Sequence, residues 1–139
     1  TPAIAQICLI GSEEEGDEMI ATPMVKSIIL MLTAEDLRKF GYDHPMGPDW
    51  RGIMDFDPVK LSREKMLKFC AEMNPQAIRD IFPVGSPRQV AAKMKGFVDA
   101  GLRVIKFMDY GGMAGAKFGA ASALKVREAE DELMLMCNG

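Results

Sequence analysis

The sequence predicts an α/β protein with about three parallel strands and flanking helices. Short apolar runs of strand length alternate with amphipathic segments of helix length, and turn or cap residues stand where they join. Strands separated by helices form parallel sheets with right-handed crossovers. The 139 residues suit one domain, so residues 1–139 are taken as a single domain with an irregular insertion at about 42–61.

The first strand is expected over residues 3–10, a nearly continuous apolar run typical of a strand covered on both faces. Ser12 and the three glutamates after it predict a helix start, because a cap hydroxyl and acidic side chains suit the positive end of a helix. This helix is expected to reach about Leu32, with a break caused by Pro23.

The middle of the chain combines short helices with an irregular stretch. Thr33 predicts a second short helix that ends at Gly41. Periodicity then disappears over residues 42–61, and a structureless stretch of this length inside a compact domain is often functional. Ser62 predicts the cap of an amphipathic helix, and Asn74-Pro75 starts another short one.

The best-defined unit runs from residue 81 to residue 108. A short strand at 81–84 is followed by Gly85-Ser86-Pro87, which reads as a turn, a cap and a first-turn proline. A helix closed by Gly101 comes next. Its apolar stripe consists of Val90, Met94, Phe97 and Val98. A strand at 102–108, a glycine-rich loop at 109–115 and a final helix at 117–136 complete the prediction.

A three-stranded parallel sheet leaves two open edges and buries little apolar surface by itself. We therefore expect the chain to need an N-terminal half or to form a homo-oligomer. The chain opens with Thr1 instead of Met, close to the first strand, which suggests a truncated product; a removed tag would look the same.

Composition excludes several classes of function. The net charge of −3 arises from 17 basic and 20 acidic residues without a basic stripe, so no nucleic-acid partner is expected. No apolar run approaches the roughly 20 residues of a membrane span, and no leader is visible, so a cytoplasmic protein is expected. Three scattered cysteines and one histidine predict neither a disulfide framework nor a metal site.

Candidate site residues follow from the rule that ligands bind at the carboxyl ends of parallel strands. Gly85 and Ser86 could hold an anionic cofactor group at a helix N-terminus, although a plain turn with a serine cap explains them too. The loop after the last strand offers a substrate-side wall, unless its glycines only permit a tight turn. Its candidate residues are Tyr110, Gly111, Gly112 and Met113.

The irregular stretch holds three more candidates. His44 is the one side chain whose ordinary pKa suits proton transfer near neutrality, but no Ser, Cys or metal-ligand cluster surrounds it. Trp50 could stack on a substrate or fill the core beneath the loop, and Arg51 stands beside it. Lys106, in the last strand, suits an internal carboxylate, an anionic substrate or a structural pairing.

The run Val84-Gly-Ser-Pro-Arg-Gln-Val-Ala-Ala-Lys-Met-Lys-Gly-Phe-Val-Asp-Ala-Gly-Leu-Arg-Val-Ile-Lys-Phe107 resembles the penultimate βαβ unit of luciferase-like flavin or deazaflavin oxidoreductases. Two further segments are similar to the branch of phthiodiolone ketoreductase-like and methylenetetrahydromethanopterin reductase-like proteins. They are His-Pro-Met-Gly-Pro-Asp-Trp-Arg-Gly at 44–52 and Met-Asp-Tyr-Gly-Gly-Met-Ala-Gly at 108–115.

The resemblance implies the C-terminal portion of a TIM (β/α)₈ barrel, which uses roughly 250 residues when complete. It implies F420 as cofactor, contacted mainly by an N-terminal half, and hydride transfer to a carbonyl or imine-like small-molecule substrate. The residues around His44 to Arg51 and Tyr110 to Met113 would line the substrate side.

Three alternatives stay open. One is an FMN-dependent luciferase-like monooxygenase, another is a non-catalytic half-barrel that acts by assembly, and the third is a small α/β domain with an anion site at Gly85 and Ser86. Whether the chain alone is an enzyme is left undecided by its sequence.

Overall fold

A computed structural model describes residues 2–138 and divides the chain into two compact units. The first unit combines residues 2–19 with 82–138, and the second comprises Ile20–Ile81. The predicted irregular stretch lies wholly inside the second unit, where it contains one short 3₁₀ helix, η2 (Gly52–Met54). Each unit has its own buried apolar residues and is described separately.

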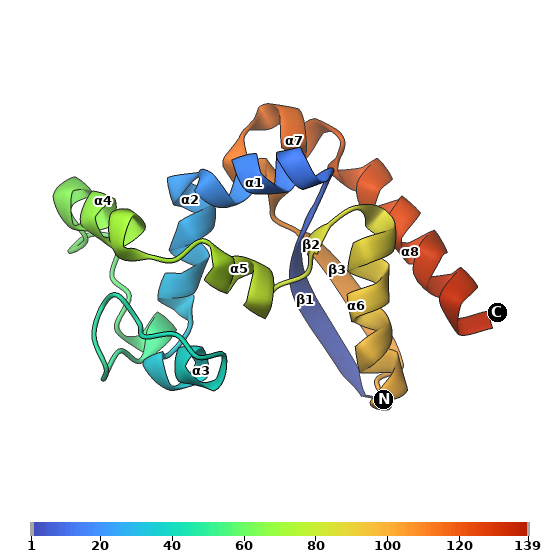
Figure 1. The fold of residues 1–139 in the computed structure, drawn as a ribbon, viewed down its shortest axis with the longest axis horizontal. Helices are drawn as coiled ribbons and strands as arrows, with labels where there is room; N and C mark the ends of the chain where they lie inside the picture. The colour runs from blue at the N-terminus through green and yellow to red at the C-terminus, as the bar shows by residue number, and fades with distance from the viewer. Residues whose placement is uncertain (1, 139) are drawn as a thin grey trace. The chain divides into compact units, whose positions relative to one another are not determined.

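The first unit contains a three-stranded parallel sheet, as predicted (Figure 1). Its strands are β1 (Ala3–Ile10), β2 (Val84–Gly85) and β3 (Val104–Asp109). The prediction of a strand at 81–84 was wrong in its bounds, because Ile81 ends a helix and only Val84 is shared. Pro83 cannot donate to a ladder, although its carbonyl oxygen accepts the N–H of Leu9 at 3.0 Å.

The strand order is β2-β1-β3, with β1 in the middle. Consecutive strands of a closed (β/α)₈ barrel are neighbours, so a barrel would place β2 between the other two. A strand of two residues cannot pair along the six residues of β3, whereas β1 does so from Ala3↔Val104 to Cys8↔Asp109. The sheet is therefore α/β and parallel, but its order is that of an open sheet.

Two helices of the first unit cover one face of this sheet (Figure 1). α6 (Pro87–Asp99) and α8 (Ser122–Asn138) pack together against side chains of β1 and β3. The shared core consists of Cys8, Ile10, Val90, Ala91, Met94, Phe107, Ala129 and Leu133. On the opposite face, Ala5 and its register partner Lys106 are exposed. Among the described residues, no ion pair involves Lys106, so neither an internal carboxylate nor a structural pairing is found.

The helix starts follow the predicted caps. Ser12, Thr33, Ser62 and Ser86 each accept the backbone N–H three residues later. Pro23 separates α1 (Glu13–Ala21) from the next helix, as expected. The remaining elements are α2 (Pro23–Lys26), η1 (Ser27–Met31), α3 (Ala34–Lys39), α4 (Arg63–Glu72), α5 (Gln76–Ile81), η3 (Gly111–Ala114) and α7 (Ala116–Ala120).

The predicted final helix over 117–136 is divided at Ala121 into α7 and α8. Gly119 weakens the helix locally, because glycine loses more backbone freedom on folding than any other residue. The hydroxyl of Ser122 donates to Asp109 Oδ2 at 2.8 Å and ties the start of α8 to the end of β3. That tertiary contact favours a new helix start at this point.

Candidate functional site

The carboxyl ends of the three strands meet at one edge of the first unit, as the parallel arrangement requires. Gly11 follows β1, and its N–H donates to the carbonyl oxygen of Gly85 at 2.8 Å. On the other side of β1, the N–H of Tyr110 donates to Cys8 O at 2.9 Å. The predicted candidates in the turn after β2 and the loop after β3 therefore flank the end of the same central strand.

Asp109 ends β3 and organises the loop that follows. Its Oδ1 atom accepts the N–H of Gly111 at 2.9 Å, while Oδ2 accepts the hydroxyl of Ser122. Burial, and then the nearby charge of Asp109, raises the pKa of the Cys8 thiol to about 12. Cys8 is consequently protonated near neutrality and cannot act as a nucleophile. Sequence reasoning missed Ser122, because no motif links residues 13 positions apart.

The turn at Gly85 and Ser86 is held by hydrogen bonds to Gln89. The N–H of Ser86 donates to Gln89 Oε1 at 2.9 Å, and the N–H of Gln89 donates to Ser86 Oγ at 3.2 Å. A Cβ atom at Gly85 would lie 2.5 Å from Gln89 Oε1, where φ is +151°. This capping box engages two N–H donors at the helix start, those of Ser86 and Gln89, so neither is free for a cofactor phosphate while Gln89 keeps this position. The Ser-x-x-Gln spacing was the sequence signal for it.

The loop after β3 folds into η3 and packs within the first unit. A Cβ atom at Gly111 would lie 3.2 Å from both Asp109 Oδ1 and Met19 Sδ. A Cβ atom at Gly112 would meet only the Cα of Gly119, at 3.5 Å. Close packing explains the glycine at 111, while the site at 112 has room for a larger residue. Tyr110 and Met113 are half-buried at this edge.

His44, the predicted catalytic candidate, lies in the second unit and is 5% exposed. Its Nε2 atom is 3.1 Å from Ile29 O, and its Nδ1 atom accepts the N–H of Met46 at 3.1 Å. Burial lowers the pKa of His44 below its ordinary value of 6.5. These contacts describe a neutral imidazole with hydrogen on Nε2, engaged at both nitrogens by backbone groups. The geometry favours a structural role for His44 over proton transfer.

Trp50 and Arg51 are also engaged within the second unit. The indole N–H of Trp50 donates to Leu30 O at 2.9 Å, and the residue is half-buried. Arg51 pairs with Asp55, with Nη2 at 2.6 Å and Nε at 2.9 Å from Oδ1. Hydrogen bonding to Arg51 lowers the pKa of the Asp55 carboxyl group. Trp50 is therefore held by a backbone oxygen, and the guanidinium of Arg51 is largely occupied by Asp55.

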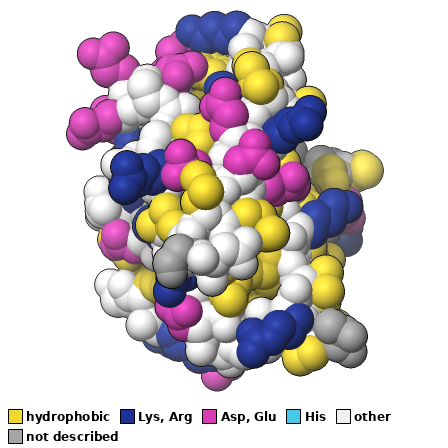
Figure 2. All heavy atoms as spheres, turned by 90° about the vertical axis from the view of Figure 1, so that its right-hand side faces the viewer, with side chains coloured by type: hydrophobic (Ala, Val, Ile, Leu, Met, Phe, Trp, Pro, Cys, Tyr) yellow, Lys and Arg dark blue, Asp and Glu magenta, His cyan; other side chains and the backbone are white. Residues whose placement is uncertain are grey.

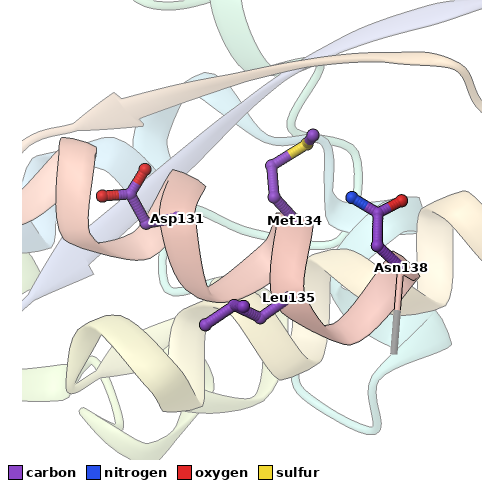
Figure 3. A pocket seen from close by; sticks show the side chains of 4 residues that line it. All are labelled: Asp131, Met134, Leu135 and Asn138. Atoms are coloured by element: carbon purple, nitrogen blue, oxygen red, sulfur yellow. The ribbon is translucent and has the colours of Figure 1, made fainter.

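Two larger hollows lie on the helix-covered side of the first unit. One, of about 440 Å³, is lined, among the described residues, by Asp131, Met134, Leu135 and Asn138 of α8 (Figure 3). Another, of about 400 Å³, lies between the end of α6, the start of β3 and α8. The side of the molecule in Figure 2 shows apolar side chains exposed between charged ones. The second hollow adjoins the amino end of β3, away from the edge where ligands of parallel sheets bind.

Within residues 2–138, no helix combines the length and apolar character needed to cross a membrane. Within the same residues, no group of three or more His, Cys, Asp or Glu side chains is placed to hold a metal ion.

Comparison with known proteins gives distant relatives. No family model matches the chain, and no solved structure matches it. A phthiodiolone/phenolphthiodiolone dimycocerosates ketoreductase of Mycobacterium tuberculosis (strain ATCC 25618 / H37Rv) is 26% identical over 106 residues, which cover 76% of this chain and 28% of the relative. The protein of the same name from Mycobacterium kansasii is 24% identical over 105 residues, 75% of this chain and 29% of the relative. The chain thus spans little more than a quarter of these relatives, and over three quarters of its own length it is similar to proteins named as ketoreductases.

Proposed function

We propose that the chain is the C-terminal part of a luciferase-like, F420-dependent oxidoreductase that transfers a hydride between a deazaflavin and a carbonyl or imine-like substrate. The observation that carries this proposal is the similarity to ketoreductases, whose name implies oxidoreductase chemistry on a carbonyl group. The parallel sheet supports it, because its carboxyl edge is where such folds bind ligands.

The exposed sheet face supports the idea of a larger fold. Ala5 and Lys106 are uncovered on it, and Val104 is 50% exposed. Both outer strands, β2 and β3, also have one unpaired edge within this three-stranded sheet. A TIM barrel would cover this face and pair these edges. In a closed barrel β2 would lie between β1 and β3, whereas the order found here is β2-β1-β3.

A deazaflavin with its phosphate-bearing chain needs free N–H donors at the carboxyl edge of the sheet. At that edge, the N–H groups of Ser12, Ser86 and Gly111 donate to side chains of this chain. These residues therefore do not form a complete cofactor cradle. We assign the main cofactor contacts to residues outside this chain. Gly85 and Ser86 remain proposed secondary contacts.

Substrate contacts are proposed in each unit by itself: the loop after β3, Tyr110 to Met113, in the first unit, and Trp50 and Arg51 in the second. Tyr110 and Trp50 are each half-buried aromatic residues, a type that suits stacking on a substrate. No general acid or base is assigned, since both nitrogens of His44 are engaged.

Two other functions remain proposals. An FMN-dependent monooxygenase would use the same fold with a different cofactor. A non-catalytic half-barrel that assembles with itself is favoured by the open strand edges and by Met134 and Leu135 on α8, which are 61% and 69% exposed.

The test titrates F420 and FMN, each followed by fluorescence, into this chain and into the longest natural polypeptide that contains it. Saturable F420 binding by the longer protein, with oxidation of reduced F420 by a ketone, is the expected result. FMN binding without F420 binding would favour the monooxygenase. Binding of neither cofactor, together with a native mass of a homo-oligomer, would contradict the proposal and favour the assembly subunit.

A further inference from the structure

One side chain, Asp109, connects the loop after β3 with the start of α8. The hydroxyl group of Ser122, the first residue of α8, donates to Asp109 Oδ2 at 2.8 Å. The other carboxylate oxygen, Oδ1, accepts the N–H of Gly111 at 2.9 Å. Both bonds are partly buried, and a carboxylate forms stronger hydrogen bonds than a neutral acceptor. The position of Gly111 in the loop is therefore coupled to the position of α8.

The backbone bonds of the loop give it a shape, and other contacts decide where that shape lies. The N–H of Met113 donates to Tyr110 O at 3.0 Å, which closes the loop on itself. The loop begins at β1, where the N–H of Tyr110 donates to Cys8 O at 2.9 Å. Beyond that point, the bonds of Asp109 to Gly111 and Ser122 hold the loop against the start of α8.

Van der Waals contacts also surround the loop. A Cβ atom at Gly111 would lie 3.2 Å from Met19 Sδ, and one at Gly112 would lie 3.5 Å from Gly119 Cα. Such contacts limit how closely the segments approach one another. A hydrogen bond also fixes an orientation, because it weakens steeply when donor and acceptor lose their alignment. The bond from Ser122 therefore restrains the loop in a way that packing does not.

The hydroxyl of Ser122 acts differently from the other hydroxyls at helix starts. Four of those accept the backbone N–H three residues later and so stabilise their own helix: Ser12, Thr33, Ser62 and Ser86. The hydroxyl of Ser122 donates instead to Asp109, outside its own helix. Alanine is a better helix former than serine, so this serine favours a tertiary contact over local helix stability.

We propose that Ser122 is a positioning residue for substrate binding. By holding the carboxylate of Asp109 it fixes Gly111, and with it the neighbouring residues Tyr110 and Met113 at the carboxyl edge of the sheet. A loop that is ordered before the substrate arrives lowers the entropic cost of binding. The inference rests on the proposed substrate role of this loop, and Ser122 itself touches neither substrate nor cofactor.

The first measurement uses this chain and follows hydrogen exchange of the Gly111 amide by nuclear magnetic resonance. Ser122→Ala removes the hydroxyl and introduces a good helix former, whereas Ser122→Thr keeps the hydroxyl. Ser62→Ala is the matched control, because it removes a hydroxyl from the start of α4 in the second unit. Exchange at Gly111 should accelerate at least tenfold in Ser122→Ala and change less than twofold in the other two variants.

The second measurement uses the longest natural polypeptide that contains this chain, with reduced F420 and with acetophenone and cyclohexanone as ketone probes. Ser122→Ala should raise the KM for the ketone at least fivefold. The Kd for F420 should change less than twofold, since the main cofactor contacts are assigned outside this chain. Ser122→Thr should keep the KM of the unsubstituted protein. A general loss of folding would instead change the KM and the Kd together.

The two measurements separate this inference from the proposed function. Unchanged exchange at Gly111 in Ser122→Ala, or an unchanged KM in an active longer protein, would overturn the inference and leave the proposed function standing. If the unsubstituted longer protein oxidises no reduced F420, the proposed function fails, and the substrate role of Ser122 fails with it. Circular dichroism verifies folding. If Ser122→Ala does not fold, Ser122→Cys, with its weaker donor, replaces it with the same expected directions.

Discussion

The Nδ1 atom of His44 accepts the backbone N–H of Met46 at 3.1 Å, which makes the chain's one histidine an acceptor inside the second unit. The opposite nitrogen, Nε2, lies 3.1 Å from Ile29 O and donates to it. Protonation would put a hydrogen on Nδ1, facing the N–H of Met46, so the folded state favours the neutral ring.

Stability is therefore expected to depend on pH through His44. Its pKa is lowered in the folded chain by burial, so the unfolded chain binds the proton more readily. The stabilisation is fully present above the ordinary pKa of 6.5 and is lost as pH falls through the lower folded value. Urea unfolding followed by Trp50 fluorescence between about pH 8 and pH 5.5 measures this loss.

The control for this pH effect is His44→Asn, which keeps an acceptor near Nδ1 but does not titrate. It removes one of two donors to Ile29 O, which keeps the N–H of Leu32, so it should cost about 0.5–1.5 kcal/mol at all pH values. The slope of stability against pH over this range should disappear. An unchanged slope in the variant would assign the pH dependence to other groups.

Among the glycines of the second unit, Gly52 should be the one whose substitution lowers stability most. Its φ is +66°, and a Cβ atom there would lie 2.6 Å from the backbone oxygen of Met31. Gly52→Ala should cost more than about 2 kcal/mol, because backbone strain and a backbone clash add. Gly41→Ala provides the comparison, since φ is +86° but nothing lies within 4 Å of its Cβ position. Similar urea midpoints for the two variants would show that the clash relaxes.

The three cysteines should differ sharply in reactivity. Cys137 is exposed, whereas Cys8 and Cys70 are buried, and burial raises the pKa of both buried thiols. Iodoacetamide at mildly alkaline pH should modify Cys137 first and Cys8 only after unfolding, since the thiolate is the reacting form. Peptide mass mapping over time gives the order. Early alkylation of Cys8 would mean that the end of β1 opens readily.

A substitution at Gly112 can distinguish an effect on function from an effect on folding in the loop after β3. A Cβ atom there meets only Gly119 Cα at an ordinary 3.5 Å, so Gly112→Val should change stability by less than about 1 kcal/mol. If the loop lines the substrate side, turnover of the longer protein should fall at least tenfold. Gly111→Val, tight against Asp109 and Met19, should lose stability as well. Equal loss of turnover and stability in Gly112→Val would count against a role for the loop.

Local interactions made much of this fold predictable. The caps at Ser12, Thr33, Ser62 and Ser86 were identified from the sequence, because each hydrogen bond spans three residues. The helix break before Pro23 follows from the missing N–H of proline. The sequence also placed the turn after β2 and the loop after β3 at one edge of the sheet, because the carboxyl ends of parallel strands lie on the same side.

Other features depended on contacts between distant residues. Ser122 ends the predicted single helix by binding Asp109, and β1 pairs with β3 across about 100 residues of chain. The same holds for His44, whose ring contacts Phe69, 25 positions away. The bounds of β2, the strand order and the partners of His44 were consequently beyond sequence patterns.

The sequence by itself determined the α/β class, the helix starts and the edge where loops gather, because these follow from hydrogen bonds within a few residues and from hydrophobic periodicity. The tertiary structure alone decided which strand is central, that Ser122 binds Asp109, and that the ring of His44 packs against Phe69. Those outcomes depend on which polar groups, distant in the sequence, form hydrogen bonds with one another when they are buried. A local sequence pattern does not specify those partners.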